Sequence, residues 1–506
     1  MASAKDIANR IPISIALVLA TVMNTIDTTI ANVALPHIQG SVSATQNEIV
    51  WVLTSYIVAT AIMTPLSGWL ALRIGRKRLL LFSIGGFTVA SMLCGAAQTL
   101  PEIVIFRLVQ GLAGASLMPL SQTSLLDLYP RKYLPQVMSV WSAAVVLGPI
   151  VGPTLGGWLT EQFSWRWVFY INLPLGILAF LGLYLGMDGK DAERPRPFDF
   201  LGFGALVLFI GAFQMMVDRG QERDWFYSHE IWAEAALAAS GLYVFIIRSM
   251  TTRHPFFSGE LLRDRNFVTT TCFTFFSGVL LFATSALLPS FMQNLLGYSA
   301  LQSGVASMPR GAGAFIAFLV VPSFIPLFGS RPVLLFGLGL TFLSLWQMAH
   351  FDLAMTSGPI MLSGLIQGLG MGFLFTPLQV FTFATLKPAL RTEGTIVANI
   401  SRNIGSSAGI SVLQALLIRK SSAAHAALAA HLSVSDPVVR WALPPFMNPQ
   451  TPVGLRALEI EVSRQSAMIG YDVIFGGLAI ATLLAVPALM FLKPPRGPVE
   501  IEIVAD

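Results

Sequence analysis

The stretch LALRIGRKRLLLF (residues 70–82) joins two long apolar runs, and FIPLFGSRPVLLF (residues 324–336) does the same in the second half of the chain. Aligned without a gap, the two stretches place Gly75 on Gly329 and Leu80 on Leu334. Each lies between the second and third apolar runs of a six-run unit, provided that the seventh and eighth runs are an insertion. Parallel six-helix units with a site between them are an architecture of secondary transporters. The sequence therefore predicts two similar helical halves.

The composition indicates a polytopic membrane protein. Only 11% of the 506 residues are charged and 54% are hydrophobic, whereas a soluble domain carries about 25% charged residues. The apolar residues gather in runs of about 18–25, long enough to cross a bilayer as helices. We count fourteen such runs, near residues 11–34, 49–71, 79–97, 101–125, 137–160, 166–186, 199–217, 231–249, 267–292, 302–324, 331–350, 357–385, 395–418 and 470–492. The fold class predicted is an all-α membrane protein with 14 transmembrane helices.

The Lys and Arg residues of the loops indicate how the chain is oriented in the membrane. With the N-terminus in the cytoplasm, 20 of the 31 Lys and Arg residues lie in the inner loops and tails and 8 lie outside. Because cytoplasmic loops carry the excess of Lys and Arg, both termini are expected in the cytoplasm. The predicted domains are an N-terminal six-helix bundle (1–186), a linker with two additional helices (187–260), and a C-terminal six-helix bundle (261–506). The last bundle contains a long periplasmic loop at 419–469.

An acidic and a basic residue are the candidates for proton coupling. Asp27, in NTIDTTIANVALP (24–36), lies about two turns inside the first run, and an intramembrane carboxylate is a functional candidate by default. Arg107, in FRLVQGLAGA (106–115), lies several residues into an apolar helix, so it should face a carboxylate or a cavity. The alternatives are a structural ion pair for Asp27 and an arginine that extends to the membrane surface for Arg107.

Two glycine-rich stretches are candidates for gating. The turn at 68–78 has a glycine at either side of its bend and a basic cluster; its candidates are Gly68, Arg73, Gly75 and Arg76. The stretch GPIVGPTLGG (148–157) places Gly148, Gly152 and Gly156 on one helix face for close packing, while Pro149 and Pro153 each remove a helical hydrogen bond. We expect a bent helix there, against which another helix can rock. Membrane anchoring and ordinary small-residue packing are the alternatives.

Polar residues within the apolar runs are the candidates for substrate binding. They are Asn24, Thr28, Asn32, Gln110, Gln379 and Asn399. Arg310 and Arg402, near predicted span edges, can pair with a carboxylate, bind substrate or anchor a helix. No cluster of His, Cys or Asp ligands and no nucleophile–base pair is evident, so we expect neither a metal, nor a cofactor, nor an enzyme.

Together these motifs resemble the fourteen-helix drug:proton antiporter family of the major facilitator superfamily, and within it the EmrB-type multidrug exporters of Gram-negative bacteria. DRGQERDWF (218–226) also resembles that subfamily's outer loop after the seventh helix. The resemblance implies proton-coupled efflux across the inner membrane, with a periplasmic adaptor protein and an outer-membrane channel as partners. One departure concerns the basic turn, where Leu72 stands in place of the usual acidic residue, so the acidic partner of the usual latch is missing.

The function expected is export of hydrophobic or amphipathic drugs by alternating access, with small lipophilic substrates, protons and the bilayer as partners. An uptake symporter and an exporter of fatty acids or other lipophilic weak acids are the alternatives. Nucleic acid is not expected, because the net charge is only +5 and the basic residues lie in short loops. The identity and charge of the substrate, the proton stoichiometry and the oligomeric state are left open by the sequence.

Overall fold

The computed structural model describes residues 10–49, 51–130, 133–187, 197–221, 223–252, 255–432, 444–448 and 450–492. Helices make up this part of the chain, and no strand occurs in it. Several helices begin at the residues that cap helices best: Thr99 and Glu102 form a capping box before α6, and Ser299 and Gln302 form another before α15.

The first half of the bundle contains α2 to α10 and is called the N-half below. Its helices are α2 (Ile11–Ser41), α3 (Gln46–Ile49), α4 (Trp51–Ile74), α5 (Arg76–Ala96), α6 (Leu100–Gly114), α7 (Leu117–Leu128), α8 (Leu134–Gln162), α9 (Trp167–Tyr170) and α10 (Asn172–Gly186). Helix α2 packs on α8 and α10, and α6 packs on α4 and α5.

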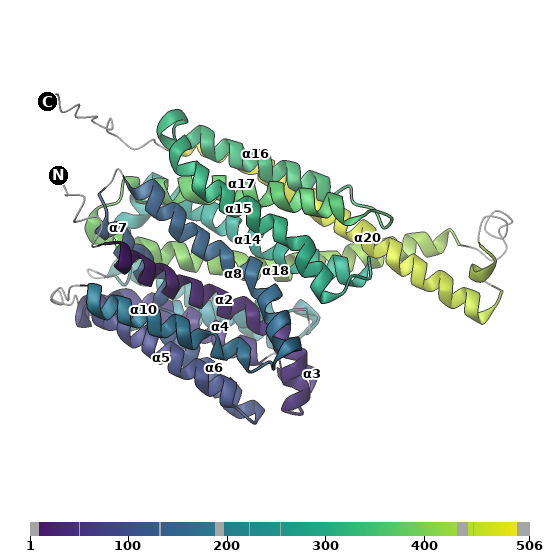
Figure 1. Cartoon of the computed structure of the whole chain (residues 1–506), viewed down its shortest axis with the longest axis horizontal. Coiled ribbons are helices and arrows are strands. Elements are labelled where there is room, and N and C mark those ends of the chain that lie inside the picture. The colour runs from purple at the N-terminus through teal and green to yellow at the C-terminus, as the bar shows by residue number, and fades with distance from the viewer. Residues whose placement is uncertain are drawn as a thin grey trace.

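The second half, called the C-half below, contains α13 to α20. Its helices are α13 (Gly259–Arg263), α14 (Arg265–Asn294), α15 (Ala300–Phe328), α16 (Ser330–Met348), α17 (Ser357–Ala384), α18 (Arg391–Ala430) and α20 (Pro452–Ala485), followed by the 3-10 helix η5 (Val486–Phe491). Helix α17 packs on α15 and α16, and α18 packs on α14 and α20. In Figure 1 the purple and blue N-half lies beside the green and yellow C-half, and α20 extends beyond the rest of the bundle.

Two further helices, α11 (Phe200–Arg219) and α12 (His229–Thr251), come between the halves in sequence. They pack on each other, and α11 also packs on α4 of the N-half and α18 of the C-half. The additional pair therefore lies beside the bundle, with α11 in contact with both halves.

The repeat seen in the sequence has a matching backbone. Gly75 joins α4 directly to α5 with φ 88° and ψ 143°, and Gly329 joins α15 directly to α16 with φ 82° and ψ 158°. These values are accessible essentially to glycine alone. The aligned glycines thus make the same turn at corresponding places, and the end of the bundle that carries them is called the Gly75 end below.

Twelve helical stretches in the described chain are long and apolar enough to cross a membrane, and α8 is a thirteenth if its two parts count as one span. Helix α8 bends by 42° between Gly148 and Ile150, where the Gly-Pro pairs predict a bend. The predicted all-α fold of long apolar helices is therefore confirmed, but the expected run at 395–418 does not pass as an apolar span. It lies on α18, whose polar residues Thr395, Asn399 and Arg402 are buried among other helices instead of facing lipid.

The segment at 419–469 is largely helical in the described part. Helix α18 continues to Ala430, and α20 begins at Pro452 after the short 3-10 helix Pro445–Met447. Residues 433–443 of this segment lie outside the described residues, as do the tail residues from 493 onward and Lys190, Arg194 and Arg196 of the linker.

Candidate proton and substrate sites

Asp27 lies at the centre of a buried polar cluster. Its Oδ2 accepts from Arg107 Nη1 at 2.6 Å, and its Oδ1 accepts from Gln110 Nε2 and Asn172 Nδ2, each at 2.9 Å. The Asp27 side chain is 0% exposed and that of Arg107 is 1% exposed. A carboxylate this deeply buried is tolerated because a guanidinium and two amides satisfy its oxygens.

The partners of Arg107 hold it in place. Its Nε donates to the Val52 carbonyl at 3.2 Å, and its Nη1 also donates to Gln110 Oε1 at 2.9 Å. The guanidinium carbon lies 4.2 Å from the centre of the Tyr56 ring, a cation–π contact within buried surroundings. Of the two orientations expected for Arg107, the structure places it on a carboxylate.

The Asp27 cluster is made entirely by helices of the N-half. Its members come from α2, α4, α6 and α10. Gln110, expected to bind substrate, belongs to this cluster instead of an inter-half cavity. Sequence reasoning missed Asn172, which also donates to Ser91 Oγ at 2.9 Å; the signal was a single amide side chain in the apolar run 166–186.

The other polar residues of the first run have separate positions. Asn24 is buried and donates to the Tyr56 hydroxyl at 3.1 Å, which places it next to the Asp27 cluster. Thr28 donates to the Thr25 carbonyl of its own helix at 2.7 Å. Asn32 is exposed in the structure.

A second polar cluster joins the two halves. Gln122 of α7 donates to Gln379 of α17 at 2.7 Å and accepts from Asn399 of α18 at 3.4 Å. One turn closer to the Gly75 end, the hydroxyls of Thr123 and Thr395 lie 2.8 Å apart. Gln379 and Asn399, both expected to bind substrate, therefore lie together on the surface where the halves meet, which is called the seam below. Gln122 is a partner that the sequence did not indicate.

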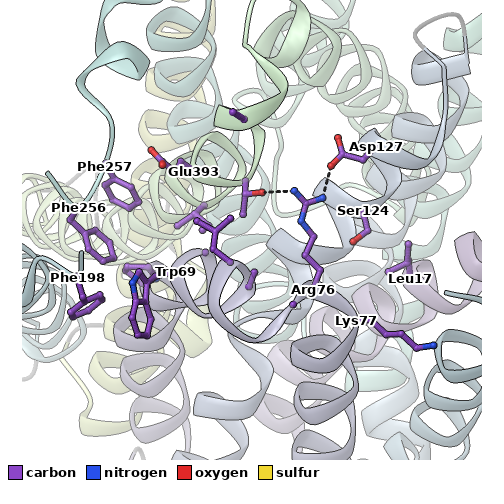
Figure 2. Close-up of a pocket in the computed structure, with 18 of the residues that line it drawn as sticks. Leu17, Trp69, Arg76, Lys77, Ser124, Asp127, Phe198, Phe256, Phe257 and Glu393 are labelled. Carbon is purple, nitrogen blue, oxygen red and sulfur yellow. Dashed lines mark hydrogen bonds and ion pairs between the residues drawn. The ribbon is translucent and has the colours of Figure 1, made fainter. Parts of the chain in front are cut away.

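The basic turn contributes to a latch at the Gly75 end. Arg76 makes an ion pair with Asp127 at the end of α7 and donates to Thr392 of α18 at 3.2 Å. Arg391 of α18 donates to the same Asp127 carboxylate at 3.0 Å. Figure 2 shows Arg76 between Asp127 and the α18 side. Although Leu72 replaces the usual acid, Asp127 supplies a carboxylate that binds one arginine from each half.

A cavity of about 700 Å³ lies beside this latch. Figure 2 shows Trp69, Phe198, Phe256 and Phe257 along one wall and Arg76 with Asp127 on the other. Leu72 lines the cavity, whereas Arg73 is exposed and its guanidinium carbon lies 5.0 Å from the centre of the Trp69 ring.

The glycine candidates lie where helices approach most closely. A Cβ at Gly148 would lie 2.3 Å from the Thr25 carbonyl of α2, one at Gly152 would lie 2.1 Å from Thr29 Oγ1, and one at Gly156 would lie 2.8 Å from Ile30. Gly68 of α4 meets Ile396 of α18 in the same way, across the two halves. Pro153 is half-buried, and the side chain of Pro149 lies outside the described part.

Two helical halves, a buried ion pair in one of them and polar contacts between them are typical of secondary transporters. The family model described as Major Facilitator Superfamily matches residues 17–410. The chain belongs to this superfamily, and its relatives include EmrB-type multidrug export proteins.

Relatives match over nearly their whole lengths. The multidrug export protein EmrB of Haemophilus influenzae is 32% identical over 495 residues, 96% of each chain. The fatty acid resistance protein FarB of Neisseria gonorrhoeae is 32% identical, again over 96% of each chain. The probable multidrug resistance protein EmrY of Escherichia coli is 33% identical, over 96% of this chain and 95% of its own.

Two solved structures share the fold. The human organic anion transporter MFSD10 matches with a TM-score of 0.61 at 14% identity, covering 95% of this chain and 99% of its own. The proton:xylose symporter XylE matches with a TM-score of 0.58 at 14% identity, covering 95% and 97%. The chain is thus a multi-pass membrane transporter, of a group whose named members export drugs or confer resistance to fatty acids.

Proposed function

We propose that this protein exports hydrophobic or amphipathic compounds across the inner membrane and that inward proton flow drives the export. The observation that carries the proposal is the Asp27–Arg107 ion pair, which is almost fully enclosed. Buried acidic residues in membrane helices commonly serve as proton carriers in transporters. The relatives named for multidrug export support drugs as the substrates.

The contacts of α2 suggest how a proton on Asp27 reaches the rest of the molecule. A neutral Asp27 loses its ion pair with Arg107, which weakens the attachment of α2 to α6. The opposite face of α2 meets α8, where Thr25 and Thr29 contact Gly148 and Gly152, and α8 packs on α15 and α17 of the C-half. A small shift of α2 is therefore passed to the seam. Because Asp27 is enclosed in this conformation, proton exchange requires a second conformation in which water reaches it.

The seam contacts suggest the direction of opening. The latch at Asp127 and the Gln122 cluster hold the halves together at the Gly75 end. With the termini in the cytoplasm, this end is the inner gate, and it must open for substrate to enter. The long ends of α18 and α20 then project into the periplasm, where a periplasmic adaptor and an outer-membrane channel complete the export path.

An exporter of fatty acids or other lipophilic weak acids is the second candidate, favoured by the similarity to the fatty acid resistance protein. A proton-coupled uptake symporter remains the third. Efflux from energised cells separates export from uptake: with a drug or dye preloaded, export predicts faster loss than in cells lacking the protein, abolished by a protonophore. Accumulation instead of loss contradicts export.

Substrate-induced proton release from the purified protein tests the coupling. We expect wild type to release protons on adding substrate at weak buffering and Asp27→Asn to release none. The matched control is Asp352→Asn, an acid on an exposed loop, which should behave as wild type. Undiminished release from Asp27→Asn would remove Asp27 from the coupling.

A further inference from the structure

Three of the arginines that the structure describes are buried inside the bundle, and only one of these three has an acidic partner. Arg107 binds Asp27, whereas neither Arg310, 5% exposed, nor Arg402, 2% exposed, has a carboxylate within ion-pair distance among the described residues. A buried charge is ordinarily paired, because removing an ion from water without a counterion costs several kcal/mol. These two guanidinium groups therefore raise the question of what neutralises them.

Arg402 lies on the surface between the halves. From α18 its Nη2 donates to Asn399 Oδ1 at 2.6 Å and to the sulfur of Met118, which belongs to α7 of the N-half. Both partners are neutral. The Nε–H and Nη1–H groups have no hydrogen-bond partner within the described chain, so donors remain for a ligand.

Asn399 connects Arg402 to the inter-half cluster. Its amide nitrogen donates to Gln122 at 3.4 Å, and Gln122 in turn donates to Gln379. Asp218 of α11 contacts α18 near this point, but it accepts from Ser407 and makes no ion pair with Arg402. Separation of the halves would remove Met118 and Gln122 and leave the guanidinium facing the opened space.

Arg310 has a different environment. Its Nη2 donates to the Leu281 carbonyl at 3.0 Å and to Thr284 Oγ1 at 2.8 Å, both on α14 of its own half. Its backbone also packs against Gly364 and Gly368 of α17. These contacts tie three helices of the C-half together, so we assign Arg310 a structural role.

We propose that Arg402 binds the anionic group of an amphipathic substrate and sets the charge preference of the transporter. A carboxylate or similar anion would accept from the guanidinium with charge-assisted hydrogen bonds, flanked by the amides of Asn399, Gln122 and Gln379. The inference rests on the proposed export function and names a chemical class of substrate within it. Since the anion replaces contacts made across the seam, its binding favours the conformation with the halves apart.

The test uses two probes of nearly equal shape and opposite charge, tetraphenylborate and tetraphenylphosphonium. Their equilibrium binding is measured on the purified full-length protein in nanodiscs of neutral lipid. We expect wild type to prefer the borate. Arg402→Gln should weaken borate binding at least tenfold, because the buried positive charge that attracts the anion is lost, and leave phosphonium binding within twofold or improved.

Two control variants distinguish loss of the charge at Arg402 from a general loss of structure. Arg402→Lys keeps the charge and should keep the preference for the borate even where its affinity falls. Arg464→Gln removes a half-exposed arginine paired with Glu461 at the other end of the bundle, and should leave both probes unaffected. Equal losses for both probes in Arg402→Gln, or none for the borate, would overturn the proposal, as would displacement of the borate by chloride at low millimolar concentration.

The proposal and the export function fail in distinguishable ways. If cells with Arg402→Gln still export a neutral dye in a protonophore-sensitive manner but have lost export of a lipophilic acid, both stand. If export of the acid is unchanged as well, the anion site is wrong and the export function stands. If wild type binds the borate through Arg402 yet exports nothing, the export function is wrong instead.

Discussion

At the scale of single residues, the members of the Asp27 cluster depend on one another for their hydrogen bonds. Three side chains from α6 and α10 use both oxygens of one carboxylate, and Arg107 has no other acidic partner in the described chain. Changing one member alone therefore leaves a charge or an amide unpaired in a buried place, which costs more than the lost contact itself.

This dependence predicts a specific pattern in a double-mutant cycle. Asp27→Asn should lower the free energy of unfolding by about 3–5 kcal/mol, since it leaves Arg107 charged and unpaired. Adding Arg107→Gln removes that charge, so the double variant should be more stable than Asp27→Asn alone, although neither transports. Thermal unfolding in detergent measures this; additive losses would show that the two side chains do not depend on each other.

At the scale of elements, glycines determine how closely helices pack. We predict that Gly148→Ala lowers thermal stability and transport markedly, because its methyl would lie 2.3 Å from the Thr25 carbonyl, a backbone atom that cannot move alone. Gly211→Ala on α11 is the control, since nothing lies within 4 Å of that site. A Gly148→Ala protein as stable and active as the control would refute close packing of α2 on α8.

The two glycine turns give a prediction about the repeat. Gly75→Ala and Gly329→Ala each force a side chain into backbone angles accessible essentially to glycine. We expect each to lose about 1–3 kcal/mol of stability, with similar values for both. Gly339→Ala, in the middle of α16 with open space around it, should be neutral. A large loss at one turn only would mean that the two are not equivalent.

At the scale of the whole molecule, the proposed export function requires the seam at the Gly75 end to open. Cysteines at positions 123 and 395 should cross-link spontaneously, because the hydroxyls now there lie 2.8 Å apart. In a background with Cys94 and Cys272 replaced, we predict that oxidation stops transport and that a reductant restores it. Each single-cysteine variant should be unaffected by oxidant. Full transport by the cross-linked protein would show that this end need not open.

The latch gives a milder test at the same scale. Asp127→Asn removes the carboxylate shared by Arg76 and Arg391 and should shift the population toward an open Gly75 end. Partly exposed ion pairs contribute only about 0–1 kcal/mol each, so we expect a shift of severalfold, seen as slower cross-linking between positions 123 and 395. Glu260→Gln breaks an exposed pair with Lys387 and should leave the cross-linking rate unchanged.

Much of this could be predicted from the sequence, because it follows from local rules. Apolar run length predicts membrane helices, and the glycines at 75 and 329 predict matching turns. Asp27 and Arg107 stand out because charges are rare in such runs. Their pairing did not follow, since it depends on the packing of α2 against α6, which are 80 residues apart at this contact.

What only the tertiary structure decided is which side chains share a surface. The sequence by itself determined the fold class and the candidate charges, since hydropathy and backbone angles are properties of neighbouring residues. The assignment of Gln110 to a buried cluster, of Asp127 to the latch in place of the missing acid at 72, and of Arg402 to the seam arises from contacts between helices far apart in the chain. Such contacts depend on how helices rotate and cross, and no local pattern encodes that geometry.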